Sequence, residues 1–295
     1  MPILFALLAA FSNALNVVTQ HKASIGDPRH RKGWRFVRYL VTNPLWLFGW
    51  IALAAAFVFQ ALALYNGKMS VVQPLLVTEL VFALVLRRLW IHQGIRAVTW
   101  WAAAATCVCL AAFIAMSEPG GGTSQPTGGA WDTAVVATAG AAGVRALLGV
   151  RGSPGRRAAF LGAATSVLWA LVATFIKAFT DSLNEYGVGG MFGHWPVYAL
   201  AATGLLAELL NQATLHVGPL SVSQPLIVIV DPIVSIALSV WVFQETFAAD
   251  APKLFVAALA FAGMCVAAAV LARTAPATME AESNLTTRPA PEAAS

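Results

Sequence analysis

Long apolar stretches constrain the fold of this chain more than any other feature of its sequence. They lie at about 3–20, 44–65, 70–86, 98–116, 131–150, 158–179, 195–216, 220–243 and 252–272. Each is close to the ~20 residues that a helix needs to cross the roughly 30 Å hydrocarbon core of a bilayer. Only 11% of the residues are charged, against about 25% in soluble domains. The sequence therefore predicts an all-α, polytopic membrane protein of about nine transmembrane helices.

The loops between these stretches alternate in positive charge. Opposing loops hold little beyond Lys68 and Lys253. The loops after the first, third and fifth stretches carry Lys22, Arg29, Arg31, Lys32, Arg35, Arg38, Arg87, Arg88, Arg96, Arg151, Arg156 and Arg157. Because Lys and Arg accumulate in cytoplasmic loops, we expect a plasma-membrane protein with an external N-terminus and a cytoplasmic C-terminus. The first stretch lacks a basic leader and is interpreted as a retained helix rather than a signal peptide.

An internal repeat connects the two halves of the chain. The segment 66–77 (NGKMSVVQPLLV) matches 217–228 (VGPLSVSQPLIV), 151 residues later, at seven of twelve positions. The repeat pairs the second and third apolar stretches with the seventh and eighth. Five stretches separate the copies, an odd number, so the copies must cross the membrane in opposite directions. Inverted repeats of this kind are typical of secondary transporters.

The repeat predicts the organisation of the chain. A first four-helix unit spans 1–116, a linking transmembrane helix 131–150, and a second four-helix unit 157–272, which makes a 4+1+4 inverted repeat. Residues 273–295 are rich in Ala, Pro, Thr and Glu and are predicted to be a disordered cytoplasmic tail. Since both units are fused in one chain, a monomer or a homodimer is expected, and the partners are the lipid bilayer and a small-molecule or ion substrate.

The segments Gly67–Leu75 and Gly218–Val234 and the closing Trp241–Glu245 resemble the drug/metabolite transporter superfamily, which includes EamA-like permeases and NIPA-like magnesium transporters. The resemblance covers roughly 43–116 and 160–272. It implies a helical bundle with a central substrate path and alternating access without ATP hydrolysis. The nine stretches and the external N-terminus depart from the ten-helix pattern and are closer to the NIPA-like arrangement.

Three acids fall near the middle of apolar stretches: Glu79, Glu208 and Asp231. A carboxylate there costs roughly 2.5–3.5 kcal/mol on insertion scales, so each is a candidate for binding a proton, a metal ion or a cationic substrate. Glu79 and Asp231 differ by one position in the repeat frame and are expected to face one cavity. Amides on the same helices and on the first stretch extend a predicted substrate path: Gln73, Gln224, Asn211, Gln212, Asn16 and Gln20.

Three prolines lie within or beside these stretches. Pro74, Pro225 and Pro232 each remove a backbone donor and free a carbonyl one turn earlier, so we expect helix breaks that supply polar groups to a solute. Packing kinks and interhelical hydrogen bonds are the alternative interpretation of the prolines and amides.

Two functions remain open at this point. The first is secondary transport of a small metabolite or drug-like solute, with Glu79 and Asp231 in the path. The second is Mg²⁺ transport, in which the same two acids would be ligands, because Mg²⁺ prefers oxygen ligands and keeps several waters. An enzyme is not expected, since the chain has no His-Glu-x-x-His, Gly-x-Ser-x-Gly or P-loop motif. No cofactor is expected, and the basic residues beside apolar stretches indicate a membrane surface rather than nucleic acid.

Overall fold

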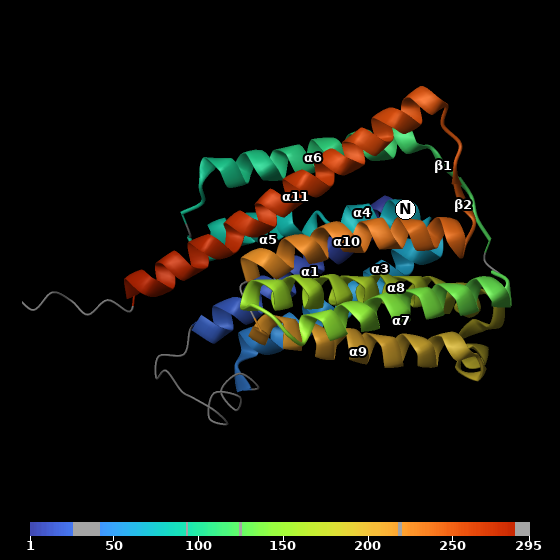
Figure 1. Ribbon diagram of the computed structural model, residues 1–295, viewed down its shortest axis with the longest axis horizontal. Helices are drawn as coiled ribbons and strands as arrows, with labels where there is room; N and C mark the ends of the chain where they lie inside the picture. Colours follow the sequence, from blue (N-terminus) through green and yellow to red (C-terminus); the bar gives the residue numbers. More distant parts are fainter. Residues whose placement is uncertain (26–41, 93, 124–125, 218–219, 287–295) are drawn as a thin grey trace, which may run out of the picture.

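The computed structural model describes residues 1–25, 42–92, 94–123, 126–217 and 220–286 as a bundle of long helices (Figure 1). The helices are α1 (Pro2–Ile25), α3 (Pro44–Asn66), α4 (Met69–Leu76), α5 (Glu79–Trp90), α6 (Ala97–Ser117), α7 (Gly128–Gly149), α8 (Pro154–Gly190), η1 (Met191–Gly193), α9 (Trp195–Val217), α10 (Leu220–Trp241) and α11 (Ala251–Thr286). Two short strands, β1 (Pro119–Gly121) and β2 (Glu245–Phe247), pair in antiparallel fashion. The basic residues between 26 and 41 lie outside the described residues.

The helix starts follow from local sequence. Proline occupies the first turn of α3 and of α8, where its missing N–H has no intrahelical partner to lose. Asn43 caps α3 by accepting a hydrogen bond from the backbone N–H of Leu45 at 2.9 Å. Ser153 caps α8 in the same manner through the N–H of Arg156 at 3.4 Å. These caps fix where the chain enters the bundle after each basic loop.

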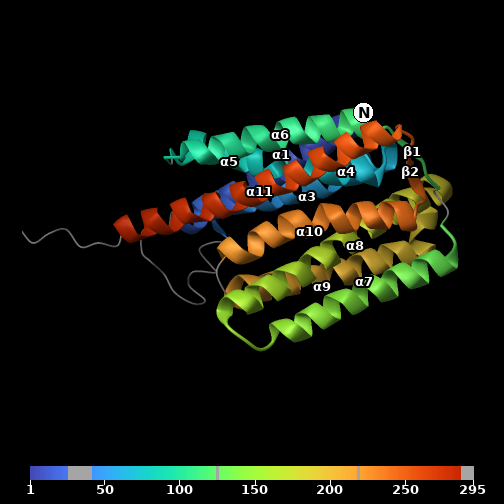
Figure 2. The same ribbon diagram turned by 45° about the horizontal axis from the view of Figure 1, so that its top comes forward.

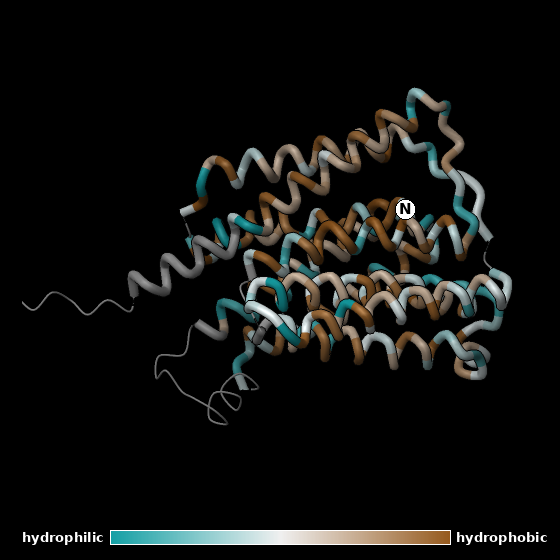
Figure 3. Tube along the Cα trace, in the orientation of Figure 1, coloured by the Kyte–Doolittle hydropathy of each residue, from teal (hydrophilic) through white to brown (hydrophobic). Residues whose placement is uncertain are grey.

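Seven of the described helical segments are long and apolar enough to cross a membrane, with α4 and α5 counted as one span. The multi-pass helical class is therefore confirmed. Within the described residues, α7 and α9 are not among the seven. The many alanines and glycines of α7 lower its mean hydropathy, and the polar residues Glu208, Asn211 and Gln212 lower that of α9. Figure 3 shows the paler colouring of α7 beside the brown of α10.

The two halves of the chain pack in corresponding ways. In the first half α1 lies along α3 and also contacts α4 and α5, and in the second half α8 lies along α9 and also contacts α10. Contacts between the halves run mainly through α6 with α11, α4 with α10 and α3 with α8. Figures 1 and 2 both show α6 and α11 side by side at one edge of the bundle.

A glycine allows the close approach of α8 to α10. A Cβ at Gly162 in α8 would lie 3.1 Å from the Cα and from the carbonyl oxygen of Ser223 in α10. Backbone atoms cannot move aside as a flexible side chain can, so this position fixes the distance between α8 and α10. Ser166, one turn later, donates a hydrogen bond to the carbonyl of Ile227 at 3.0 Å.

The two ends of the bundle differ in chemistry. At the end where α1, α5, α7 and α9 finish, Lys22 donates to the carbonyl of Trp90 and Arg157 to that of Gly149. We call this the basic end. The opposite end carries the β1–β2 pair, and we call it the hairpin end (Figure 1). The positive charges that the sequence placed in alternate loops thus gather at one end, as far as the chain is described.

The chain end differs from the expectation. Helix α11 continues to Thr286, whereas the sequence predicted a disordered tail from residue 273. The remaining part of that tail, 287–295, lies outside the described residues.

Candidate functional site

A partly open cavity of about 680 Å³ lies inside the bundle, lined by α1, α3, α4, α5, α8 and α10 with smaller contributions from α9 and α11. Its size is within the roughly 300–1,000 Å³ that is common for small-molecule sites. Much of its wall is aliphatic, with Phe57 and Trp169 as aromatic members. Its polar and charged lining residues are Asn13, Asn16, His21, Gln60, Gln73, Glu79, Arg87, Asn211, Gln224 and Asp231.

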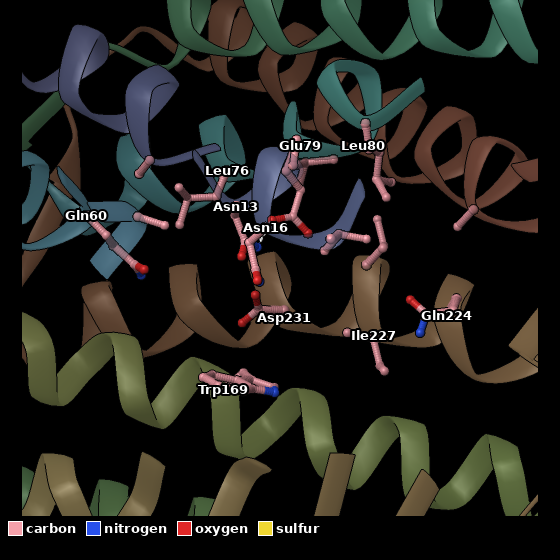
Figure 4. A pocket seen from close by; sticks show the side chains of 18 of the residues that line it. Asn13, Asn16, Gln60, Leu76, Glu79, Leu80, Trp169, Gln224, Ile227 and Asp231 are labelled. Carbon is pink, nitrogen blue, oxygen red and sulfur yellow. Dashed lines mark hydrogen bonds between the residues drawn. The ribbon is translucent and has the colours of Figure 1, made fainter. Parts of the chain in front are cut away.

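Two acids face each other across this cavity. Figure 4 shows Glu79 of α5 pointing from one wall toward Asp231 of α10 on the other, with Asn16 of α1 between them. The two carboxyl groups are close enough to interact electrostatically. Asn13 donates a hydrogen bond to Glu79 from α1. Ser235, one turn along α10, donates to Asp231 at 3.3 Å.

Amide side chains surround the acids. Gln73 is only 3% exposed, and its Nε2 has no hydrogen-bond partner among the described residues. Gln224 and Gln60 lie on opposite sides of the acids in Figure 4, and Asn211 of α9 also lines the cavity. Because a buried amide donor without a partner is costly, the Nε2 of Gln73 is a natural contact for a bound molecule.

Basic groups lie nearer the basic end of the cavity. His21 of α1 and Arg87 of α5 both line it and interact electrostatically with each other. The Nε of Arg87 is buried and has no hydrogen-bond partner among the described residues. The cavity therefore has acids near its middle and a guanidinium toward one end.

The hairpin end is closed by several contacts. The carboxylate of Glu245, in β2, is buried and accepts hydrogen bonds from the backbone N–H groups of Met69 and Ser70 at 2.8 and 2.9 Å. Lys177 of α8 donates to the carbonyl of Leu64 at 3.0 Å and pairs with Asp181 at 3.1 Å.

Aromatic rings reinforce this closure. Trp131 packs on Phe175, Trp195 and Phe243 with ring centroids 5.0 to 5.8 Å apart. In α3 and α4 the lining of the cavity reaches only to Gln60 and Gln73 on this side. A solute in the cavity is therefore separated from the hairpin end by these packed side chains and by the buried hydrogen bonds of the Glu245 carboxylate to α4.

Six of the nine predicted path residues come together in the cavity: Glu79, Asp231, Gln73, Gln224, Asn211 and Asn16. Three others do not line it. Glu208 and Gln212 are exposed on the outer face of α9, where Gln212 donates to Glu208 at 2.5 Å. Gln20 donates instead to Asn16 at 2.6 Å. A helix presents only a stripe about 100° wide to one neighbour, and with Asn211 facing inward, Gln212 is turned about 100° away.

The prolines behave differently from one another. The helix is interrupted at Val77 and Thr78, shortly after Pro74, so that α4 and α5 are separate. The predicted breaks at Pro225 and Pro232 are wrong, because α10 is continuous from Leu220 to Trp241. Pro225, the sixth residue of that helix, removes the donor for the carbonyl of Ser221 without ending the helix. Pro232 removes the donor for the carbonyl of Val228, and both residues line the cavity.

Several cavity residues were not assigned to the site from the sequence. Asn13 and Gln60 were merely polar positions in apolar stretches, Arg87 was a loop charge, and His21 lies at the end of the first stretch. The signal that connects them is spacing: Asn13 and Glu79 are in contact, and His21 and Arg87 each follow eight residues later. Among the described residues, no three of the types His, Cys, Asp and Glu gather closely enough to hold a metal ion.

The fold and cavity thus define a helical protein of the multi-pass membrane class with a charged internal cavity. The chain is 28% identical over 276 residues to an uncharacterized protein of Corynebacterium glutamicum, and the match covers 93% of this chain and 95% of that one. No family model and no solved structure matches the chain.

Proposed function

We propose that this protein is a secondary transporter that moves a small metabolite or drug-like solute by alternating access. The observation that carries the proposal is the cavity in which Glu79 and Asp231 face each other from α5 and α10, two helices of the repeat. A mid-membrane acid is costly unless it serves a proton, an ion or a cationic solute. Here two of them share one internal space with the amide nitrogen of Gln73, which is unpartnered among the described residues.

An inverted 4+1+4 repeat supports the proposal. The rainbow colours of Figure 1 show α4 and α5 running toward the basic end and α10 running away from it. Gln73 and Gln224, 151 residues apart, both line the cavity, as do Glu79 and Asp231 one position out of register. The offset extends to Trp90 and Trp241 at the ends of α5 and α10. Such pseudo-symmetry makes states open to either side similar in energy.

The closed hairpin end supports alternating access in particular. The cavity extends toward the basic end, while Glu245 and the aromatic residues around Trp131 close the hairpin end. In the other state the contact of Glu245 with α4 must separate, and the basic end must close. The topology we propose has the N-terminus outside and the basic end in the cytoplasm of the cell that carries the protein.

One observation favours Mg²⁺ as a second candidate substrate. The cavity places two carboxylates beside amide oxygens, which are the hard ligands that Mg²⁺ takes while it retains water. The guanidinium of Arg87 in the same cavity opposes the entry of a dication, so the metabolite is ranked first.

A flux assay in proteoliposomes with internal pH and Mg²⁺ dyes tests the proposal. We expect a solute from a metabolite panel to drive dye-detected proton movement or its own uptake in the wild type. Asp231→Asn and Glu79→Gln should each abolish that flux, because each removes a charge from the cavity. Glu208→Gln is the matched control, since this acid lies on the outer face of α9. Unchanged flux in both cavity variants would contradict the proposal, and a Mg²⁺ signal lost in Asp231→Asn would favour the second candidate.

A further inference from the structure

The cavity departs from the symmetry of the repeat at a single charged position. Adding the offset of 151 to Arg87 gives Leu238, which is 2% exposed in the hydrophobic core. The acids and the glutamines have counterparts in both halves, but this guanidinium does not. The cavity is therefore polarised: its positive charge lies only toward the basic end.

Helix geometry sets the separation between the acidic and basic parts. Asn13 of α1 contacts Glu79 of α5, which places these two residues at one level. His21 and Arg87 follow eight residues later on the same two helices, which run in the same direction (Figure 1). At 1.5 Å per residue, the second level lies about 12 Å further along the bundle.

One nitrogen of the partly buried Arg87 guanidinium has no hydrogen-bond partner within the described ranges. Its Nε is buried without a hydrogen-bond acceptor among the described residues. Neither Glu79 nor Asp231 forms an ion pair with it in the described part of the chain. A charge away from water is tolerated when it is paired and hydrogen-bonded, so the Nε of Arg87 offers an anion a donor that is not yet used. Gln73 shows the same deficit toward the other end, with a buried, unpartnered Nε2.

We propose that the cavity binds an elongated zwitterion, with its cationic group at Glu79 and Asp231 and its carboxylate or phosphate at Arg87 and His21. This inference rests on the proposed function and names its substrate class. A simple cation leaves Arg87 unpaired, and a simple anion that reaches the acids is repelled by them. The two levels are about 12 Å apart along the helices, and the long side chains of Glu79 and Arg87 shorten the distance that a ligand has to cover. A ligand with charges on opposite ends of a short alkyl chain therefore spans it. The apolar walls, including Trp169, suit that chain.

Calorimetric titration of the purified full chain in detergent tests the inference with four probes: 6-aminohexanoate, hexylamine, hexanoate and glycine. We expect 6-aminohexanoate to bind at least about tenfold more tightly than either singly charged probe, which corresponds to one additional charge-assisted hydrogen bond. Glycine carries both charges but is too short to reach both levels, so it should bind more weakly than 6-aminohexanoate. Equal affinity for 6-aminohexanoate and hexylamine in the wild type would overturn the inference.

Variants assign the charge preference to its residue. Arg87→Leu, which introduces the residue of the repeat counterpart, should bind hexylamine as the wild type does but lose the preference for 6-aminohexanoate. Arg87→Lys should retain part of that preference. Arg88→Leu is the matched control, because it removes a positive charge one residue away on the exposed surface, outside the cavity lining. A preference that survives Arg87→Leu would overturn the inference.

A second variant covers the case in which Arg87→Leu does not fold as a monodisperse protein. Asp231→Asn should weaken hexylamine and 6-aminohexanoate but leave the affinity for hexanoate at or above that of the wild type. The opposite order would contradict the assignment of the two ends.

Equilibrium binding also separates this inference from the proposed function. A preference for 6-aminohexanoate without any flux would contradict the transport proposal but not the zwitterion inference. Flux of other solutes by a protein that shows no such preference would contradict the zwitterion inference but not the transport proposal.

Discussion

Glu245 binds Met69 across 176 positions of sequence, with its carboxylate 2.8 Å from the backbone nitrogen at the start of α4. Its second oxygen accepts from Ser70 at 2.9 Å, so two of the free N–H groups of that helix start are satisfied. The repeat counterpart of Glu245 is Gly94, which has no side chain to bind the start of α10. The hairpin end thus has a carboxylate latch without a counterpart at the basic end among the described residues, which favours the state closed at the hairpin end.

Removing this latch should open the hairpin end. We expect Glu245→Ala to lower the free energy of unfolding by about 1.5–3 kcal/mol, the usual value of hydrogen bonds to a charged group, and to raise solvent access at that end. Thermal denaturation and hydrogen exchange of α4 measure the two effects. Glu118→Gln is the control, because its ion pair with Lys253 is at the same end but nearly half exposed, and exposed pairs contribute little to stability. Equal effects of the two variants would argue against a latch.

The hydrogen bond from Asn13 orients Glu79 in the cavity. Asn13→Leu should reduce the initial rate of flux by about tenfold, as expected for the loss of roughly one hydrogen bond to a charged group. The comparison is Asn66→Leu, since Asn66 is exposed and donates to its own helix at Leu62. Initial rates in proteoliposomes measure both variants. An Asn13 variant as fast as the Asn66 variant would show that this contact has no role in transport.

The approach of α8 to α10 tolerates no side chain at Gly162. Gly162→Leu should destabilise the fold by about 1–3 kcal/mol through overpacking, because the new Cβ would meet backbone atoms of Ser223. Gly204→Leu on α9 is matched to it, since no atom lies within 4 Å of a Cβ built there. Thermal melts in detergent compare them. If the two melted alike, the packing described for α8 and α10 would be incorrect.

Hydropathy and the repeat predicted much of this architecture for a physical reason. Lipid requires long apolar helices, so the positions of the spans could be read from the sequence. Burial cost and the 151-residue offset together selected Glu79, Asp231, Gln73 and Gln224, which the structure brings together.

Other parts of the site could not be predicted in the same way. The polar stripe of α9 was known, but not which neighbour it faces, so Glu208 and Gln212 were placed in a cavity from which the structure turns them away. Arg87 was interpreted as a topology signal, because a charge near a span end is normally a loop residue. The contact between Asn13 and Glu79 in the structure aligns α1 with α5 and shows that His21 and Arg87 share a level.

The central claim is that the cavity reaches both sides of the membrane in turn, and thiol labelling of Ala173→Cys tests it most directly. The background replaces Cys107, Cys109 and Cys265, and the residue lines the cavity on α8. Ala134→Cys, fully buried outside the lining, is the unreactive control. An impermeant reagent applied to right-side-out and inside-out vesicles should label the cavity cysteine from both sides, faster from the hairpin end when Glu245→Ala is added. Labelling from one side only, in both backgrounds, would contradict alternating access.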